Sequence, residues 1–121
     1  MSNFLLILAN IFLAVSGQIF IKQGVNKIGS FSEMQLGQFL LKSIESPLVI
    51  MGLILYFISA AIWVMVLSKV DLSFAYPMLS LGYILILIFS ALFLGESIGA
   101  LKIAGVILIC AGIFLIFRTG A

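Results

Sequence analysis

Polar side chains recur at a regular spacing within the first apolar stretch of the chain. Asn10, Gln18 and Lys22 belong to one four-residue series, and Ala14 fills the remaining position. In an α-helix each four-residue step turns only about 40° around the axis, so these positions form one slowly turning stripe. Amides exchange hydrogen bonds and a lysine carries a positive charge, which is the chemistry of ligand binding. The alternative is that Asn10 and Gln18 only hydrogen-bond neighbouring helices, but a stripe that ends in a cation favours a site.

A second polar face lies in the third apolar stretch. Ser73, Tyr76, Pro77, Ser80 and Tyr83 are three or four residues apart, which places them on one side of a helix. Pro77 has no N–H to donate to the carbonyl of Ser73, so it should kink the helix and free that carbonyl. The sequence predicts a bent helix that lines a polar cavity, or else a tolerated kink packed by small residues.

A third face, in the second apolar stretch, carries Tyr56, Ser59 and Trp63. Ordinary packing and an aromatic belt at the membrane surface also explain it, and for Trp63 that explanation is favoured. Glu96, in a later turn, should share an interface with Lys22 and pair with it; the alternative is a surface ion pair of little energetic value. The candidate substrate-binding residues are Asn10, Gln18, Lys22, Tyr56, Trp63, Tyr76, Ser80, Tyr83 and Glu96.

The elements that must position these side chains follow from composition. Of the 121 residues 64% are hydrophobic and only 8% are charged, and the mean hydropathy is +1.41. Soluble domains are about half apolar and a quarter charged, so the chain is predicted to be an all-α integral membrane protein. With roughly 20 residues per span, residues 1–121 form one domain of four transmembrane helices. The predicted spans are about 4–22, 47–67, 73–94 and 98–117, and the first is interpreted as a span rather than a removable signal peptide.

The long connection between the first two spans has an amphipathic pattern. Its polar residues share one helical face and its apolar residues share the other, which is typical of a helix lying in the membrane interface. An outward extension of the second span explains the pattern equally well. The polar residues are Gln35, Gln38, Lys42 and Glu45, and the apolar residues are Leu36, Phe39, Leu40, Leu41 and Ile44.

Several classes of function are excluded by composition. The chain has no His and a single cysteine, Cys110, so an internal disulfide and a Cys/His metal site are excluded. It shows neither a phosphate-binding glycine loop nor a nucleophile constellation, so we expect no enzyme activity, no cofactor and no metal. The net charge is only +2, without a basic cluster, so nucleic acid is not an expected partner.

Small residues mark one face of the fourth span. Gly105 and Gly112 are seven residues apart, and Ala104 and Ala111 flank them. Small residues let another helix approach closely, so the two glycines are predicted to form a dimer contact. Close packing inside the same four-helix unit is the alternative.

Cations are distributed unevenly between the two ends of the predicted bundle. Four spans put both termini on one side. That side holds Lys69 and Arg118, whereas the other holds Lys22, Lys27, Lys42 and Lys102. The positive-inside rule places the second set in the cytoplasm, by a margin of two charges that also fits insertion in both orientations.

Four segments resemble the drug/metabolite transporter superfamily. They are residues 14–22 (AVSGQIFIK), 73–83 (SFAYPMLSLGY), the Gly95–Glu96 turn and residues 105–112 (GVILICAG). Two four-helix branches compete. The run 108–112 is similar to the small multidrug resistance family, whose members form antiparallel dimers through that helix. The pairs 17–18 and 22–23 and the run 75–81 look more like the EamA-like group that contains the aminoarabinose-phosphoundecaprenol flippase subunits. Spans one, three and four carry the resemblance, and span two matches only in general character.

Ala14 separates the two branches. The multidrug exporters carry at this position a glutamate that binds protons and cationic drugs in turn, and no other acid lies at that depth here. The resemblance therefore implies a flippase in the bacterial inner membrane for a polyprenyl-phosphate-linked monosaccharide. The polar side chains would bind sugar hydroxyls, and Lys22 would meet the phosphate. The long first connection departs from the short first loop of both branches.

The resemblance also implies an assembly. A bundle of 121 residues is thin, so we expect a homodimer, or a heterodimer with a similar four-helix protein, to enclose the path. Two alternatives stay open: a multidrug-type exporter of small cationic compounds, and an accessory subunit without a transport path.

Overall fold

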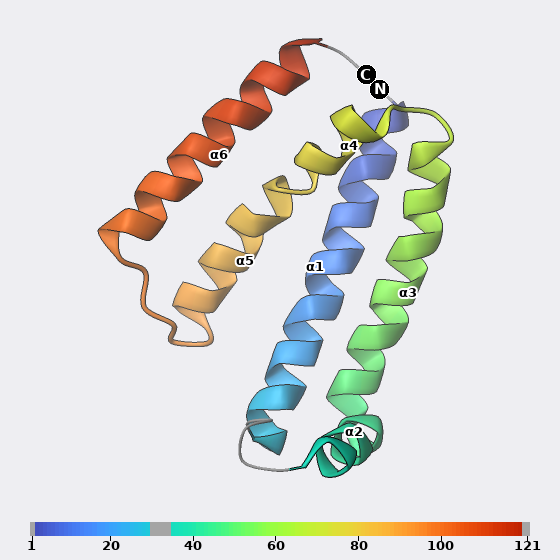
Figure 1. Ribbon diagram of the computed structural model, residues 1–121, viewed down its shortest axis with the longest axis vertical. Helices are drawn as coiled ribbons and strands as arrows, with labels where there is room; N and C mark the ends of the chain where they lie inside the picture. Colours follow the sequence, from blue (N-terminus) through green and yellow to red (C-terminus); the bar gives the residue numbers. More distant parts are fainter. Residues whose placement is uncertain (1, 30–34, 120–121) are drawn as a thin grey trace.

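The computed structural model describes residues 2–29 and 35–119, and every regular element within these ranges is a helix. The helices are α1 (Ser2–Ile28), α2 (Leu36–Glu45), α3 (Pro47–Leu67), α4 (Leu72–Met78), α5 (Leu81–Leu92) and α6 (Ala100–Thr119). Four segments are long and apolar enough to cross a membrane: Asn3–Ile28, Pro47–Leu67, Leu72–Leu92 and Ala100–Thr119. The predicted all-α fold with four transmembrane helices is confirmed. The start of α1 and the end of α6 lie at the same end of the molecule (Figure 1).

The first helix is longer than the first predicted span. It continues past Lys22 to Ile28 because no residue in that stretch interrupts helical hydrogen bonding, and Gly24 is buried against α3. The helix ends at Gly29, whose φ of 107° is a left-handed conformation that glycine adopts readily. The last turn of α1 therefore lies beyond the residues expected within the membrane.

Helices α1 and α3 run side by side along most of their length, held close by glycine (Figure 1). A Cβ atom at Gly17 would lie 2.7 Å from the carbonyl oxygen of Gly52, and one at Gly52 would lie 2.5 Å from that of Gly17. The two backbones approach closely only because neither residue has a side chain. This pair is the rigid part of the scaffold.

The third span is interrupted. Helix α4 ends at Met78, two residues of turn follow, and α5 begins at Leu81. The N–H of Leu79 donates to the carbonyl of Tyr76 at 3.0 Å, and the N–H of Ser80 donates to that of Pro77 at 3.0 Å. These three-residue bonds tighten the chain directly after Pro77, where a proline removes the regular α-helical bond.

The apolar core lies where α1, α3 and α4 meet one end of α6. Its buried members are Ile7, Ile11, Val15, Val66, Val70, Ala75, Met78 and Ile113. Gly82 brings α5 onto α1, since a Cβ there would lie 3.0 Å from Val15 and 3.2 Å from Ile11. The core thus fixes α4 and α5 against the polar stripe of α1.

Helix α6 is fixed mainly at its end. The ring of Phe117 contacts Phe4 at a centroid distance of 5.8 Å and Phe74 at 6.4 Å, and Ile113 is buried beside them. Only 6% of the residues in its membrane-length stretch are buried, against 28% of those in the corresponding stretch of α1. A Cβ at Gly105 or Gly112 would meet no described atom of another helix within 4 Å. The alternative, close packing of these glycines inside the same four-helix unit, is therefore not found within the described chain. Their role in a dimer stays a prediction.

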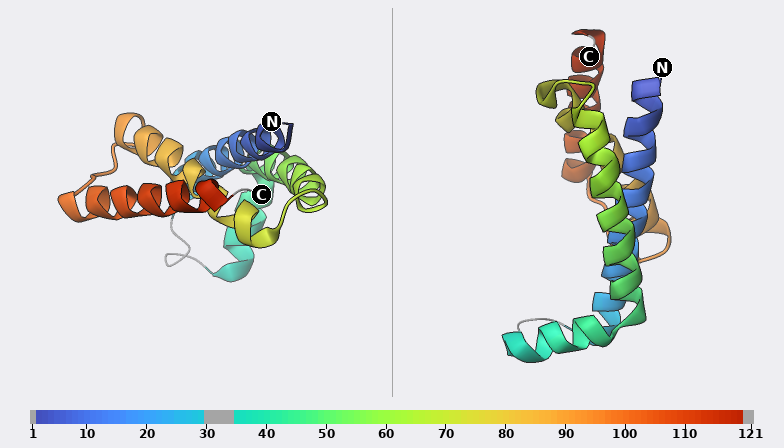
Figure 2. Two further views of the ribbon diagram at one scale, coloured as in Figure 1. Left: turned by 90° about the horizontal axis from the view of Figure 1, so that it is seen from above. Right: turned by 90° about the vertical axis from the view of Figure 1, so that its right-hand side faces the viewer.

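Helix α2 is separate from α3 and lies across its end (Figure 2). Ser46 breaks the helix with an extended conformation, φ −80° and ψ 119°, and its hydroxyl accepts the N–H of Val49 at 3.4 Å. The alternative of one continuous helix is not what the structure contains. The apolar residues Leu36, Leu40, Leu41 and Ile44 are all exposed, as an interfacial helix requires.

Candidate functional site: a polar groove with a charged end

A groove of about 500 Å³ lies between α1, α3 and the interrupted span α4–α5. Helix α1 contributes Asn10, Ile11, Ala14, Val15 and Gln18, and α3 contributes Tyr56, Ser59, Ala60 and Trp63. The third wall consists of Tyr76, Leu79, Ser80, Gly82, Tyr83 and Ile86, with Ile109 from α6. The size is that of a site for one small ligand or headgroup.

Seven of the nine predicted site residues line this groove. They are Asn10, Gln18, Tyr56, Trp63, Tyr76, Ser80 and Tyr83. The other two, Lys22 and Glu96, form a pair one helical turn beyond Gln18. The three polar faces that helical spacing predicted therefore meet in one groove. Their role in binding a substrate stays a prediction.

The amide of Asn10 is available to a ligand. Asn10 is only 4% exposed, and it makes no side-chain hydrogen bond to any described residue. Among the described residues, every fully buried side-chain nitrogen or oxygen has a hydrogen-bond partner. Because the amide of Asn10 has none, its polar atoms are accessible, and Asn10 lines the groove. Gln18 likewise makes no such bond. Within the described chain, the two amides do not serve to join neighbouring helices.

Aromatic rings line the groove from α3 and from the interrupted span. Trp63 packs edge-on against Tyr76, with centroids 6.3 Å apart and planes at 71°. Tyr56 is 44% exposed, Tyr76 63% and Tyr83 40%, so this aromatic wall is partly open at the surface of the single chain. Such a wall can stack on the faces of a ligand and hydrogen-bond its edges.

The groove contains no acid. Ala14 lies in its wall, and no Asp or Glu is among its described lining residues. A site for a cation at this depth needs a charged partner. The lining offers uncharged hydrogen-bonding groups and aromatic faces instead.

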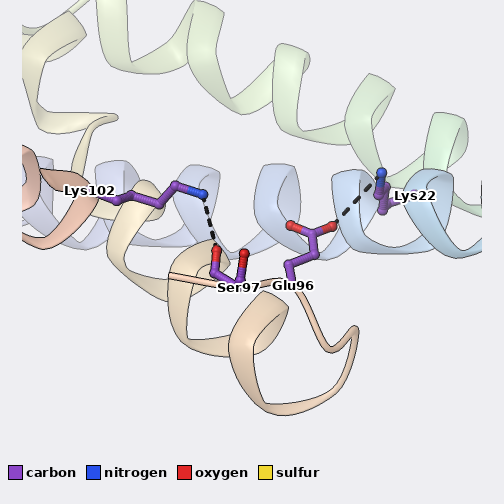
Figure 3. A network of polar contacts seen from close by, with 4 residues as sticks. All are labelled: Lys22, Glu96, Ser97 and Lys102. Carbon is purple, nitrogen blue, oxygen red and sulfur yellow. Dashed lines mark hydrogen bonds and ion pairs between the residues drawn. The ribbon is translucent and has the colours of Figure 1, made fainter. Parts of the chain in front are cut away.

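Charge gathers at one end, in and beside a second cavity of about 200 Å³ that shares Tyr83 and Ile86 with the groove. The ammonium of Lys22 lies 3.8 Å from a carboxylate oxygen of Glu96, so the predicted pair is present. On the other side of the turn, Lys102 donates to the carbonyl oxygen of Ser97 at 3.4 Å (Figure 3). The groove therefore ends at two lysines that flank one glutamate.

Sequence reasoning missed part of the lining. Ser59 was predicted to share the face of Tyr56 and Trp63 but was left out of the candidate substrate-binding residues, and it lines the groove. Its hydroxyl donates to the carbonyl of Tyr56 at 2.7 Å. Ile109 was not detectable, because an apolar residue on an apolar helix carries no signal of what it faces.

Comparison with known proteins decides the family. The model of the EamA-like transporter family matches residues 1–118. The chain belongs to the EamA-like transporter family. It is thus a multi-pass membrane protein of a transporter family, in agreement with the prediction that it is not an enzyme.

Proteins similar to this EamA-like chain are named as subunits of one type of flippase. A probable 4-amino-4-deoxy-L-arabinose-phosphoundecaprenol flippase subunit ArnF from Erwinia tasmaniensis is 34% identical over 116 residues, which cover 90% of this chain and 89% of that protein. The ArnF of Photorhabdus laumondii is 40% identical over 72 residues, covering 58% of this chain and 57% of its own. A subunit ArnE from Pseudomonas paraeruginosa is 31% identical over 75 residues, covering 62% and 65%. No solved structure matches. The resemblance to this branch is confirmed.

Proposed function

We propose that this EamA-like protein is a subunit of a flippase for a polyprenyl-phosphate-linked monosaccharide in a bacterial inner membrane. The observation that carries the proposal is an uncharged, aromatic-walled polar groove that ends at lysines, in a chain similar to proteins named as subunits of such a flippase. A sugar needs hydroxyl partners and stacking faces, and a phosphodiester needs a cation.

The sugar is held by the groove. The amides of Asn10 and Gln18 meet its hydroxyls from α1, and the rings of Tyr76 and Tyr83 face it from the interrupted span. Lys22 lies one turn beyond Gln18, which suits a phosphate joined directly to the sugar. The polyprenyl tail leaves through the open aromatic side and stays in the lipid. Transfer then consists of movement, without bond breaking.

A partner covers the exposed helix. Helix α6 is almost entirely uncovered in the single chain, and Gly105 and Gly112 leave room for a second helix to approach. The partner is a second copy or a similar four-helix subunit, and the names of the relatives as subunits support the latter.

A cation exporter of the multidrug type is disfavoured by the groove. Exchange of a proton for a cation needs a titrating acid at membrane depth, and Ala14 stands in that wall. An accessory role without a path is disfavoured by a groove in which the amides of Asn10 and Gln18 have no hydrogen-bond partner in the described chain.

The test is transfer of a fluorescent polyprenyl-phosphate monosaccharide across proteoliposomes that contain the protein with its partner subunit. Lys22→Ala and Gln18→Ala should each abolish transfer, while size-exclusion chromatography shows an unchanged assembly. Lys69→Ala, at the other end of the bundle, is the matched control and should retain transfer. Full transfer by both groove variants would disprove the assigned path.

A further inference from the structure

Glu96 lies between two cations that come from different helices. Lys22 reaches its carboxylate from α1, and Lys102 reaches the neighbouring residue Ser97 from the first turn of α6 (Figure 3). Residues 96 and 97 are adjacent, so their Cα atoms are about 3.8 Å apart and both ammonium groups address one short stretch of chain. This stretch is the turn between α5 and α6.

The backbone of Glu96 is held by a hydrogen bond, whereas its side chain is held only by a long, exposed ion pair. Its N–H donates to the carbonyl of Ser90 at 3.0 Å, and the preceding Gly95 turns the chain with a φ of 68°. The ion pair itself is long, and the side chains of Lys22 and Glu96 are 51% and 44% exposed. Exposed pairs of this kind contribute only about 0–1 kcal/mol, so a competing anion can replace the carboxylate.

The cavity beside this turn has the donors that a phosphate needs. Its lining includes Lys102, Ser97, Ser90 and Tyr83, together with Glu96 itself. Lysine and hydroxyl groups are donors to phosphate oxygens. Tyr83 and Ile86 also line the groove, so a sugar in the groove and a phosphate in this cavity would be neighbours.

We propose that Lys22 and Lys102 form a two-lysine site for the phosphodiester of a lipid, and that Glu96 occupies Lys22 until this phosphodiester displaces it. The inference rests on the proposed function and deepens it, because it adds Lys102 as a phosphate-binding residue and Glu96 as a placeholder. A phosphodiester carries one negative charge, as the carboxylate does, so the exchange leaves the net charge of the site unchanged. The phosphodiester also has two anionic oxygens, but unlike the carboxylate of Glu96 it is not attached to the turn, so it can lie where both lysines reach it.

The experiment measures binding of a short-chain probe, citronellyl-phosphate glucose, to the full chain together with its partner subunit in nanodiscs. Lys102→Gln should weaken binding about ten- to a hundredfold, the size of one lost charge-assisted hydrogen bond. Glu96→Gln should tighten binding about two- to fivefold, because it removes a competitor worth no more than an exposed ion pair. The pair Lys22→Gln with Lys102→Gln should weaken binding more than either change alone.

Three controls make the result specific to phosphate. Lys69→Gln and Glu45→Gln change the same charges outside the site and should leave affinity unchanged. Citronellyl glucoside, which has the sugar without the phosphate, should bind with the same affinity to every variant. Phosphatidylglycerol should compete poorly; displacement of the probe by an equal concentration of it would assign the site to bulk phospholipid and overturn the proposal.

The remaining outcomes separate this inference from the proposed function. If Lys22→Gln weakens binding of the probe while Lys102→Gln and Glu96→Gln bind it as the wild type does, the two-lysine site is wrong and the flippase proposal stands. Weaker binding by Glu96→Gln would also overturn it, since Glu96 would then support the site instead of occupying it. If the wild-type chain does not bind the probe, both proposals fail.

Discussion

At the scale of single residues, the groove is marked by two amides, of Asn10 and Gln18, that have no hydrogen-bond partner in the described chain. Asn10 is nearly buried and still makes no side-chain hydrogen bond, so its amide is held ready for a ligand. Residue types and helical spacing were enough to predict seven residues of the wall, because polar groups at membrane depth are costly and face a partner or a cavity. The apolar Ile109 could not be predicted, since nothing distinguishes it from its lipid-facing neighbours.

Ala14 gives the sharpest test at this scale. Ala14→Glu should weaken binding of an anionic sugar lipid about tenfold, because the new carboxylate would stand in the groove about two helical turns from Lys22 and would repel the phosphate there at reduced dielectric. Binding of citronellyl-phosphate glucose measures the effect. Ala14→Gln, equal in size but uncharged, is the control and should lose much less. Equal losses in both variants would show that size, and not charge, matters.

At the scale of elements, glycines decide how close the helices approach. The sequence pointed to Gly105 and Gly112 as a contact between two chains, which stays a prediction, whereas within the described chain the tight contact is Gly17 against Gly52. Helix boundaries were predictable from apolar runs, and α3 has the predicted bounds. The pairing of glycines was not predictable, because spacing on one helix does not reveal which helix lies opposite.

Gly17→Ala is therefore expected to destabilise the bundle. Its Cβ would lie 2.7 Å from a backbone oxygen of α3, and backbone cannot move aside as a flexible side chain would. Overpacking of this kind costs about 1–3 kcal/mol. Unfolding followed by circular dichroism in detergent should show the loss, whereas Gly99→Ala, with nothing within 4 Å, should unfold like the wild type. Equal stability of the two variants would contradict the close contact.

At the scale of the whole molecule, one chain is an incomplete bundle. Three spans enclose a groove whose aromatic residues are partly exposed, and α6 presents a nearly uncovered apolar surface. A lipid tail fits such an opening, and a partner fits such a helix. The sequence indicated an assembly through small residues on this helix, but one chain cannot reveal whether the partner is identical.

Gly105→Leu tests the assembly. The position is free of neighbours in the described chain, so folding should be unaffected, while a large side chain should hold the partner's helix away. Native mass spectrometry should show a monomer where the wild type is a dimer, and thermal unfolding should show a folded chain. Leu101→Ala, a change at an exposed residue on the same helix, is the control. A dimer that persists in Gly105→Leu would move the interface elsewhere.

The most direct test of the account is the identity of the lipid that stays bound when the protein is purified gently from bacterial membranes. Mass spectrometry of the wild-type chain should find a polyprenyl phosphate bearing one sugar, and Lys22→Ala should lose it. That result would support the groove as a sugar site and its charged end as a phosphate site. Retention of only bulk phospholipid, unchanged in Lys22→Ala, would contradict the proposed substrate.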